Sequence, residues 1–164
     1  MGDRHSVGLS LYPFIRINAS VFDFTAPSGW RRAGGTESGM RAIVIGASAD
    51  RSKFGNKAVR AYLKAGWEVV GVNPNAAGTE VEGVTVFETV GHVPQVEGGY
   101  DRALFYIPPR FGVNAVRKVA ERGDVAEVWL NPGADGPEVI AAAEELGVPF
   151  VQACAIMDIG PMPR

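Results

Sequence analysis

Apolar runs and amphipathic segments alternate along most of the chain. The first run, Ala42–Ile45, is followed at once by Gly46, which is typical of a strand buried on both faces of a parallel sheet. Residues 58–63 next place apolar side chains on one face of a helix, and Gly66 follows as its C-terminal cap. The second run, Trp67–Val72, predicts the strand to which that helix returns.

The same alternation continues through the C-terminal part of the chain. Further strands are predicted at Gly83–Phe87, Ala103–Ile107, Val125–Leu130 and Val148–Gln152. One helix is expected to end near Gly123, and Asp135 is expected to cap a last helix that has Pro137 in its first turn. Parallel strands require crossover connections, and right-handed crossovers cover both faces of the sheet. The sequence therefore predicts a single-domain α/β fold with a Rossmann-like, doubly wound parallel sheet in three layers.

The first 39 residues do not share this pattern. They mix Arg, Ser, Gly and Pro with scattered aromatic residues, and only Phe14–Val21 has the character of a strand. Met40 stands immediately before the first strong strand. We therefore expect residues 1–39 to be a poorly structured N-terminal extension or an over-long reading frame, with a clasp or partner-binding arm as the alternative. Residues 40–164 are then the folded domain.

Composition excludes several classes of function. A net charge of -2 over 164 residues gives no broad electrostatic reason to bind nucleic acid or an anionic membrane. One cysteine, Cys154, and two isolated histidines, His5 and His92, form neither an internal disulfide nor a recognisable metal site. No apolar run approaches the roughly 20 residues that cross a bilayer. We expect a cytoplasmic, metal-free protein that binds a small molecule.

The loop after the first strand carries the clearest binding signal. Its small residues, which let a ligand approach the backbone, are Gly46, Ala47 and Ser48. The helix that follows turns its N-terminal amides toward this loop, and such amides attract anions. Arg51 and Lys53 add positive charge, which suits a ligand with several phosphates. The alternative interpretation is a solvated, charged loop without a ligand.

Two departures from the usual NAD site narrow the kind of nucleotide. The glycine-rich dinucleotide fingerprint is absent, because Ser48 and Arg51 stand at its second and third glycine positions. The second strand ends in Val72-Asn73-Pro74, where an NAD site normally offers a carboxylate to the ribose. A carboxylate there would repel a 3′-phosphorylated ribose, so Asn73 favours such a ligand.

Four short motifs, in this order and spacing, resemble the CoA-binding domain family. They are Gly46-Ala47-Ser48, Val72-Asn73-Pro74, Tyr106-Ile107-Pro108-Pro109 and Asn131-Pro132-Gly133. The resemblance spans about Met40 to Ile159 and is closest to small stand-alone predicted CoA-binding proteins, which are similar to the CoA-binding domain of the succinyl-CoA ligase α subunit. It implies the same Rossmann-like fold and CoA or an acyl-CoA as the ligand.

The resemblance also implies a role for each group of residues. The phosphates would be approached by Gly46, Ala47 and Ser48 and paired with Arg51 and Lys53. The adenosine side would be lined by Val72, Asn73 and Pro74. The pantetheine path would be flanked by Ile107, Pro108 and Pro109. Cys154 follows the last predicted strand, where it lies near the cleft or is a small buried hydrophobe.

No complete catalytic constellation is visible, so we expect a non-catalytic binding protein or partner subunit, not an enzyme by this chain alone. An NAD(P)-binding oxidoreductase subunit is the main alternative, with Arg51 and Lys53 on a 2′-phosphate. A scaffold that has kept the fold and lost the ligand is another. The acyl group, and whether a homo-oligomer or a partner protein completes the site, stay open.

Overall fold

A single, mostly parallel sheet runs through the molecule. The computed structural model describes residues 16–17 and 39–164 of the chain. Within these residues, the sheet has the strand order β1-β8-β7-β6-β2-β3-β5-β4. The parallel strands are β2 (Arg41–Ile45), β3 (Glu68–Val72), β5 (Val84–Phe87), β6 (Tyr100–Phe105), β7 (Val125–Leu130) and β8 (Phe150–Gln152). Two short antiparallel strands, β1 (Arg16–Ile17) and β4 (Glu80–Val81), form its outer edges.

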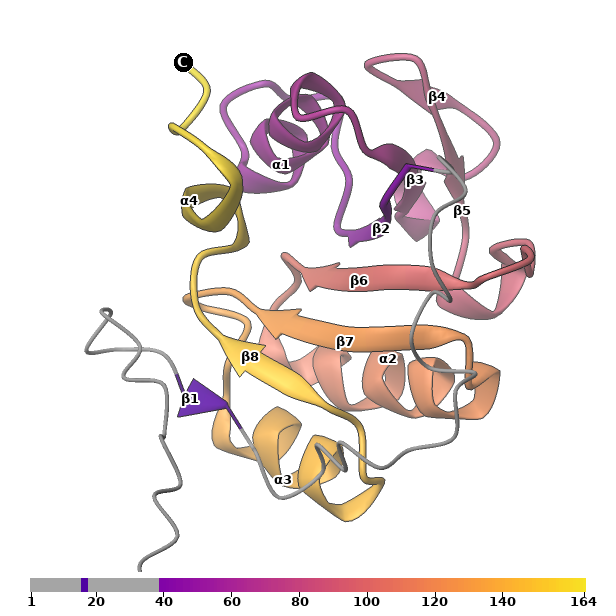
Figure 1. Ribbon diagram of the computed structural model, residues 1–164, viewed down its shortest axis with the longest axis vertical. Helices are drawn as coiled ribbons and strands as arrows, with labels where there is room; N and C mark the ends of the chain where they lie inside the picture. Colours follow the sequence, from indigo (N-terminus) through magenta and orange to yellow (C-terminus); the bar gives the residue numbers. More distant parts are fainter. Residues whose placement is uncertain (1–15, 18–38) are drawn as a thin grey trace, which may run out of the picture.

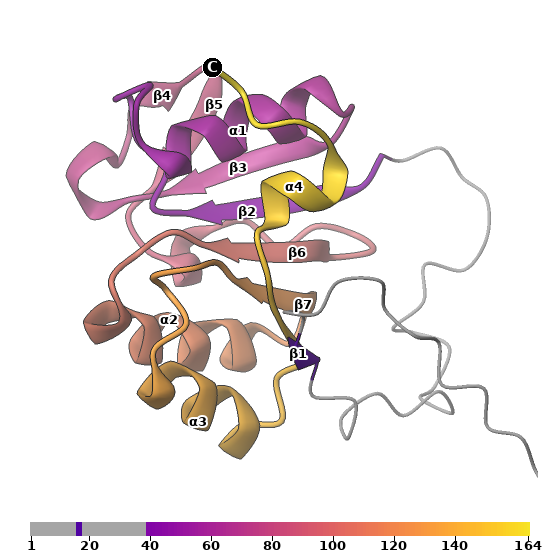
Figure 2. The same cartoon turned by 90° about the vertical axis from the view of Figure 1, so that its left-hand side faces the viewer.

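Helices cover both faces of the sheet, which confirms the predicted three-layer arrangement (Figures 1 and 2). One face carries α1 (Phe54–Lys64) and α4 (Ala155–Ile159), and the other carries α2 (Pro109–Arg122) and α3 (Pro137–Glu145). Side chains of β2 alternate between the two cores: Ile43 belongs to the cluster with α2, and Val44 to the cluster with α1. Both are fully buried, as the continuous apolar run predicted.

The fourth predicted strand, Ala103–Ile107, was wrong in its bounds. The strand β6 covers Tyr100–Phe105, so it both begins and ends earlier than predicted. Asp101, near its start, accepts a hydrogen bond from the Arg41 amide of β2 at 2.7 Å. Arg102 lies between the rings of Trp67 and Trp129, with its guanidinium carbon 5.2 and 4.3 Å from their centroids. A charged side chain in that position masks the strand pattern.

The predicted cap of the last helix was also wrong. The residue that precedes α3 is Gly136, while the Asp135 carboxylate accepts hydrogen bonds from the Gly133 amide (3.1 Å) and from Gln152 Nε2 (3.2 Å). The final strand begins at Phe150, later than the predicted Val148. The hairpin strand β4 and the short helix α4 were not predicted at all. None of the described helices is long and apolar enough to span a membrane.

The N-terminal expectations fall mostly on residues that the structure does not describe. The prediction of a poorly structured extension over residues 1–39 lies outside the described residues, apart from residues 16–17 and 39. Within the predicted strand Phe14–Val21, Arg16 and Ile17 do form β1, which pairs antiparallel with β8.

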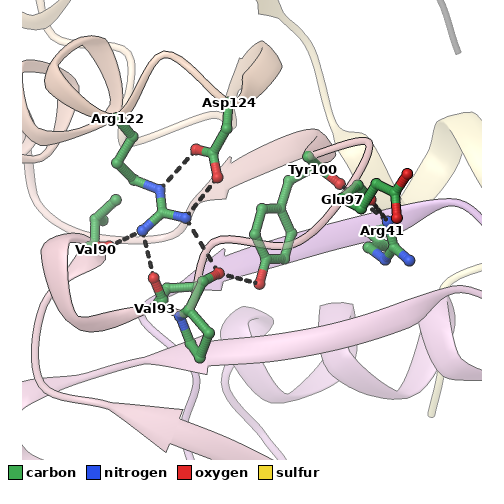
Figure 3. A network of polar contacts seen from close by, with 9 residues as sticks. Arg41, Val90, Val93, Glu97, Tyr100, Arg122 and Asp124 are labelled. Atoms are coloured by element: carbon green, nitrogen blue, oxygen red, sulfur yellow. Dashed lines mark hydrogen bonds and ion pairs between the residues drawn. The ribbon is translucent and has the colours of Figure 1, made fainter.

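Arg122, the last residue of α2, holds together the segments at the amino edge of the sheet by hydrogen bonds (Figure 3). Its guanidinium donates to both carboxylate oxygens of Asp124 (2.9 and 2.8 Å) and to the carbonyls of Val90 and Val93. The Tyr100 hydroxyl donates to the Pro94 carbonyl at 2.9 Å. Burial raises the pKa of Tyr100, so this hydroxyl stays a donor. The segment between β5 and β6 is thus fixed at the edge opposite the strand ends that Gly46 and Asn73 follow.

Candidate functional site

A cleft of about 620 Å³ opens at the carboxyl ends of β2 and β6. These strands are neighbours in the sheet, but the chain leaves β2 toward β3 on one side and β6 toward β7 on the other. In doubly wound sheets, ligands bind at such a switch point. The lining comes from three segments, Lys53–Gly55, Tyr106–Pro109 and Asn131–Ala134, and from two single residues, Gly46 and Cys154.

Five of the eleven residues predicted to contact the ligand lie together in this cleft. They are Gly46, Lys53, Ile107, Pro108 and Pro109. Gly46 has a φ of +100°, and a β-carbon on it would meet the Tyr106 carbonyl oxygen at 2.5 Å. The loop that Gly46 opens, residues 46–53 and here named the binding loop, therefore starts in direct contact with the segment after β6.

The remaining six predicted residues do not line the cleft. Ala47 and Val72 are buried in the sheet ends, and Pro74 is exposed at the start of the 3₁₀ turn Pro74–Ala76. Arg51 is exposed at the outer side of the binding loop, where its Nε lies 3.4 Å from Glu82 Oε1. Ser48 and Asn73 take part in hydrogen bonds within and beside the binding loop.

Two side-chain amides orient the binding loop. Asn73 Nδ2 donates to the Ala47 carbonyl, and Asn56 Nδ2 donates to the Ser48 carbonyl, both at 2.8 Å. In a trans peptide the N–H points opposite to the C=O of the same unit. The amides of Ser48 and Ala49 therefore face away from these two asparagines, and within the described part of the chain neither donates to a protein acceptor. Successive outward amides of this kind form an anion-binding concavity.

The first turn of α1 completes the concavity. A β-carbon on Gly55 would lie 2.0 Å from the Gly46 carbonyl oxygen, so only glycine lets the helix start this close to β2. The amides of Phe54 and Gly55 have no acceptor among the described residues. Together with the exposed Lys53, they place partial and full positive charge at the cleft mouth.

Charge in the binding loop is mixed. Hydrogen bonds from the Ser52 side chain (2.6 Å) and amide (2.9 Å) to Asp50 lower the pKa of that carboxyl, so it is charged at neutral pH. Lys57 lies over the Phe54 ring, with its nitrogen 5.3 Å from the centroid. The described residues hold no group of three His, Cys, Asp or Glu side chains that could bind a metal ion.

The opposite end of the cleft is formed by Asn131, Tyr106 and Cys154. Asn131 and Tyr106 belong to the sequence motifs but had no predicted contact, and Cys154 lines the cleft, which is one of its two expected positions. Asn131 is 2% exposed; its Nδ2 donates to the Phe105 carbonyl (3.1 Å), and its Oδ1 accepts from the Ala155 amide (2.8 Å). This fixes the backbone next to Cys154, whose partly exposed side chain lines the cleft. The Tyr106 hydroxyl is buried and has no hydrogen-bond partner among the described atoms. Burial, with Cys154 nearby, raises the pKa of Tyr106.

Comparison with known proteins gives relatives of two sizes. The succinate–CoA ligase [ADP-forming] subunit alpha of Aquifex aeolicus is 31% identical over 94 residues, which are 57% of this chain and 30% of that protein. This chain therefore spans less than a third of that curated relative. A conserved hypothetical protein from Pyrococcus furiosus has 28% identity and a TM-score of 0.62, covering 73% of this chain and 98% of its own.

A larger solved enzyme shares the fold. The dinucleotide-forming acetyl-coenzyme A synthetase 1 of Ca. Korarchaeum cryptofilum, solved in complex with phosphate and ADP, has a TM-score of 0.56 and 23% identity, covering 67% of this chain and 25% of its own. The family model described as CoA binding domain matches residues 41–159, which include every strand and helix that borders the cleft. Because this match covers most of the chain, the chain belongs to the CoA binding domain family.

Proposed function

We propose that this chain binds coenzyme A or an acyl-CoA in the carboxyl-edge cleft, as a non-catalytic binding protein or a partner subunit. The observation that supports this most directly is the orientation of the binding loop. The amides of Ser48 and Ala49 face away from Asn56 and Asn73, and the first amides of α1 are without protein acceptors among the described residues. The phosphates would bind there, with Lys53 as their cationic partner.

The rest of the ligand would follow the cleft away from the binding loop. Ile107, Pro108 and Pro109 offer an apolar wall along which the pantetheine arm would lie, and the thiol or thioester end would approach Cys154. The β-carbons and prolines of this wall fit an extended, uncharged chain better than a second charged group.

The adenosine would lie beyond the end of β3. The Asn73 side chain is occupied on both sides, since its Oδ1 also accepts from the Asn75 amide (2.9 Å). Contacts to the adenosine would thus come from the backbone of this segment and from the exposed ring of Pro74. No carboxylate follows β3 directly, which leaves room for the 3′-phosphate that distinguishes CoA from NAD.

Thermal unfolding with CoA, acetyl-CoA, NAD and NADP in separate samples tests this proposal. A ligand at about 100 times its dissociation constant stabilises the folded state by roughly 2.7 kcal/mol. We expect CoA or acetyl-CoA to raise the melting temperature and the two dinucleotides to leave it unchanged. A shift with NADP alone would instead support the oxidoreductase-subunit alternative, and no shift with any of them would favour a ligand-free scaffold.

We further propose that residues 40–164 are the CoA-binding unit. All elements that border the cleft lie within them. A shortened chain that begins at Met40 is expected to give the same CoA-dependent shift as the full chain. Loss of the shift on shortening would assign residues 1–39 a part in binding.

A further inference from the structure

The hairpin that joins β4 to β5 has a glutamate at a backbone position that suits it poorly. Val81 pairs with Val84, so Glu82 and Gly83 are the two central residues of the turn, with φ of 51° and 78°. Such turns favour Asn or Gly, because both central residues need a left-handed backbone. Among the described residues, Glu82 is the only residue other than glycine with a positive φ. Backbone strain of this kind persists where other contacts hold the residue in place.

The Glu82 side chain contacts the binding loop and the helix that follows it. Its Oε1 accepts a hydrogen bond from Asn56 Nδ2 at 3.2 Å and lies 3.4 Å from Arg51 Nε. The Glu82 side chain is 25% exposed, against 66% for Arg51. Glu82, which lies outside the binding loop and its flanking elements, therefore contacts both Asn56 on α1 and Arg51 in the loop. Figure 2 shows β4 beside the start of α1.

Asn56 transmits this contact to the loop backbone. It is fully buried, and the Nδ2 that donates to Glu82 also donates to the Ser48 carbonyl. Its Oδ1 accepts from Arg60 Nε at 2.8 Å, and Arg60 Nη2 donates to the Arg51 carbonyl at 3.1 Å. The orientation of the Asn56 amide, which sets that of the Ser48–Ala49 peptide, is thus fixed by two acceptors at its nitrogen and by one donor, Arg60, at its oxygen.

From these contacts we propose that Glu82 is a positioning residue for the phosphate site. It fixes the Asn56 amide so that the Ser48 carbonyl is held and the Ala49 amide faces outward, and it keeps the Arg51 side chain next to the loop. This rests on the proposed CoA site. Because the Arg51 side chain is largely exposed, its ion pair with Glu82 contributes little free energy. A ligand phosphate can therefore replace Glu82 as the partner of Arg51.

Three variants of the full chain separate this role from a structural one. Glu82→Asn improves the turn but is too short to reach Asn56 and Arg51. Glu82→Gln keeps the length and the acceptor oxygen for Asn56. Glu80→Gln, on the same hairpin and exposed, is the matched control. For each, the melting temperature is measured without ligand, and CoA is titrated by isothermal calorimetry.

We expect Glu82→Asn to melt close to the wild-type temperature, because the better turn residue offsets the lost hydrogen bond to Asn56, while its CoA dissociation constant rises about tenfold. Glu82→Gln should bind within roughly threefold of the wild type, because only an exposed ion pair is lost. Unchanged affinity in Glu82→Asn, or equal losses in both Glu82 variants, would overturn the inference. A wild-type chain that binds no CoA would refute the proposed function itself, which the wild-type titration shows separately.

Discussion

The Asn73 side chain donates a 2.8 Å hydrogen bond to the Ala47 carbonyl, and so ties the end of β3 to the loop that follows β2. The Asn73→Asp change keeps the acceptor for the Asn75 amide but places a carboxylate against a carbonyl oxygen. We expect the free energy of unfolding to fall by about 1–3 kcal/mol and CoA affinity to fall at least about tenfold. Denaturant unfolding and calorimetric titration measure the two effects. Gln95→Glu, the same amide-to-carboxylate change at an exposed position between β5 and β6, is the control and should change neither.

Lys53 is expected to act on the ligand and not on the fold. It is exposed, and its side chain makes no capping hydrogen bond to α1. Lys53→Ala should therefore weaken CoA binding by about three- to tenfold at low salt, with the difference shrinking as salt screens the charge. Titrations at two ionic strengths check this, and Lys64→Ala at the far end of α1 is the matched control. Equal affinities of Lys53→Ala and wild type at low salt would contradict a phosphate contact.

Cys154 is expected to be protected by the ligand. Its side chain lines the cleft and is partly exposed, so a thiol reagent can reach it. Saturating CoA should slow alkylation by iodoacetamide, followed by intact-protein mass spectrometry, whereas NAD should leave the rate unchanged. Alkylation at the same rate with and without CoA, under conditions where calorimetry shows binding, would move the pantetheine end away from Cys154.

Gly55 is expected to tolerate no side chain. Because a β-carbon there would lie 2.0 Å from the Gly46 carbonyl oxygen, Gly55→Ala must displace either α1 or the end of β2. We expect a loss of about 1–3 kcal/mol in the free energy of unfolding, the usual cost of overpacking, together with loss of CoA binding. Gly160→Ala is the control, since nothing lies within 4 Å of its added carbon.

Stability should decline in alkali through Tyr62. Burial raises the pKa of Tyr62 to about 12, while Arg102 opposes the shift. Because the folded-state pKa is the higher one, the stabilisation is complete below the unfolded value near 10 and is lost as pH rises from about 10 to 12. The loss should approach about 1.4 kcal/mol for each pH unit in that window. Denaturant unfolding of wild type and Tyr62→Phe across this range measures it, and parallel curves for the two proteins would contradict the assignment.

The parts of the fold that can be predicted from the sequence are the strands whose side chains are buried on both faces of the sheet. A run such as Ala42–Ile45 is apolar because both faces of the strand are covered, and the glycine after it marks where the chain must turn. Since the carboxyl ends of parallel strands share one edge, predicting β2 and β6 in outline also placed Gly46 and Ile107 at one cleft.

The parts that the sequence did not reveal depend on contacts between distant residues. Helix α4 is five residues long, and its first residue, Ala155, is held by Asn131 through its amide and by the Tyr62 hydroxyl (3.2 Å) through its carbonyl. The buried Asn56 resembles any polar residue of a helix until its partners Ser48 and Glu82 are known. Neither pairing leaves a periodic signal, so no pattern along the chain predicts them.

The two outermost strands have a consequence for how copies of the protein can meet. Both β1 and β4 run antiparallel to their neighbours and are two residues long. An unpaired edge strand is a template on which another chain can add by backbone hydrogen bonds, and its reach grows with its length. Within the described residues, each edge here offers only two positions to such an addition. Association with a second copy or a partner is therefore expected to use side chains on the helical layers and not continuation of the sheet.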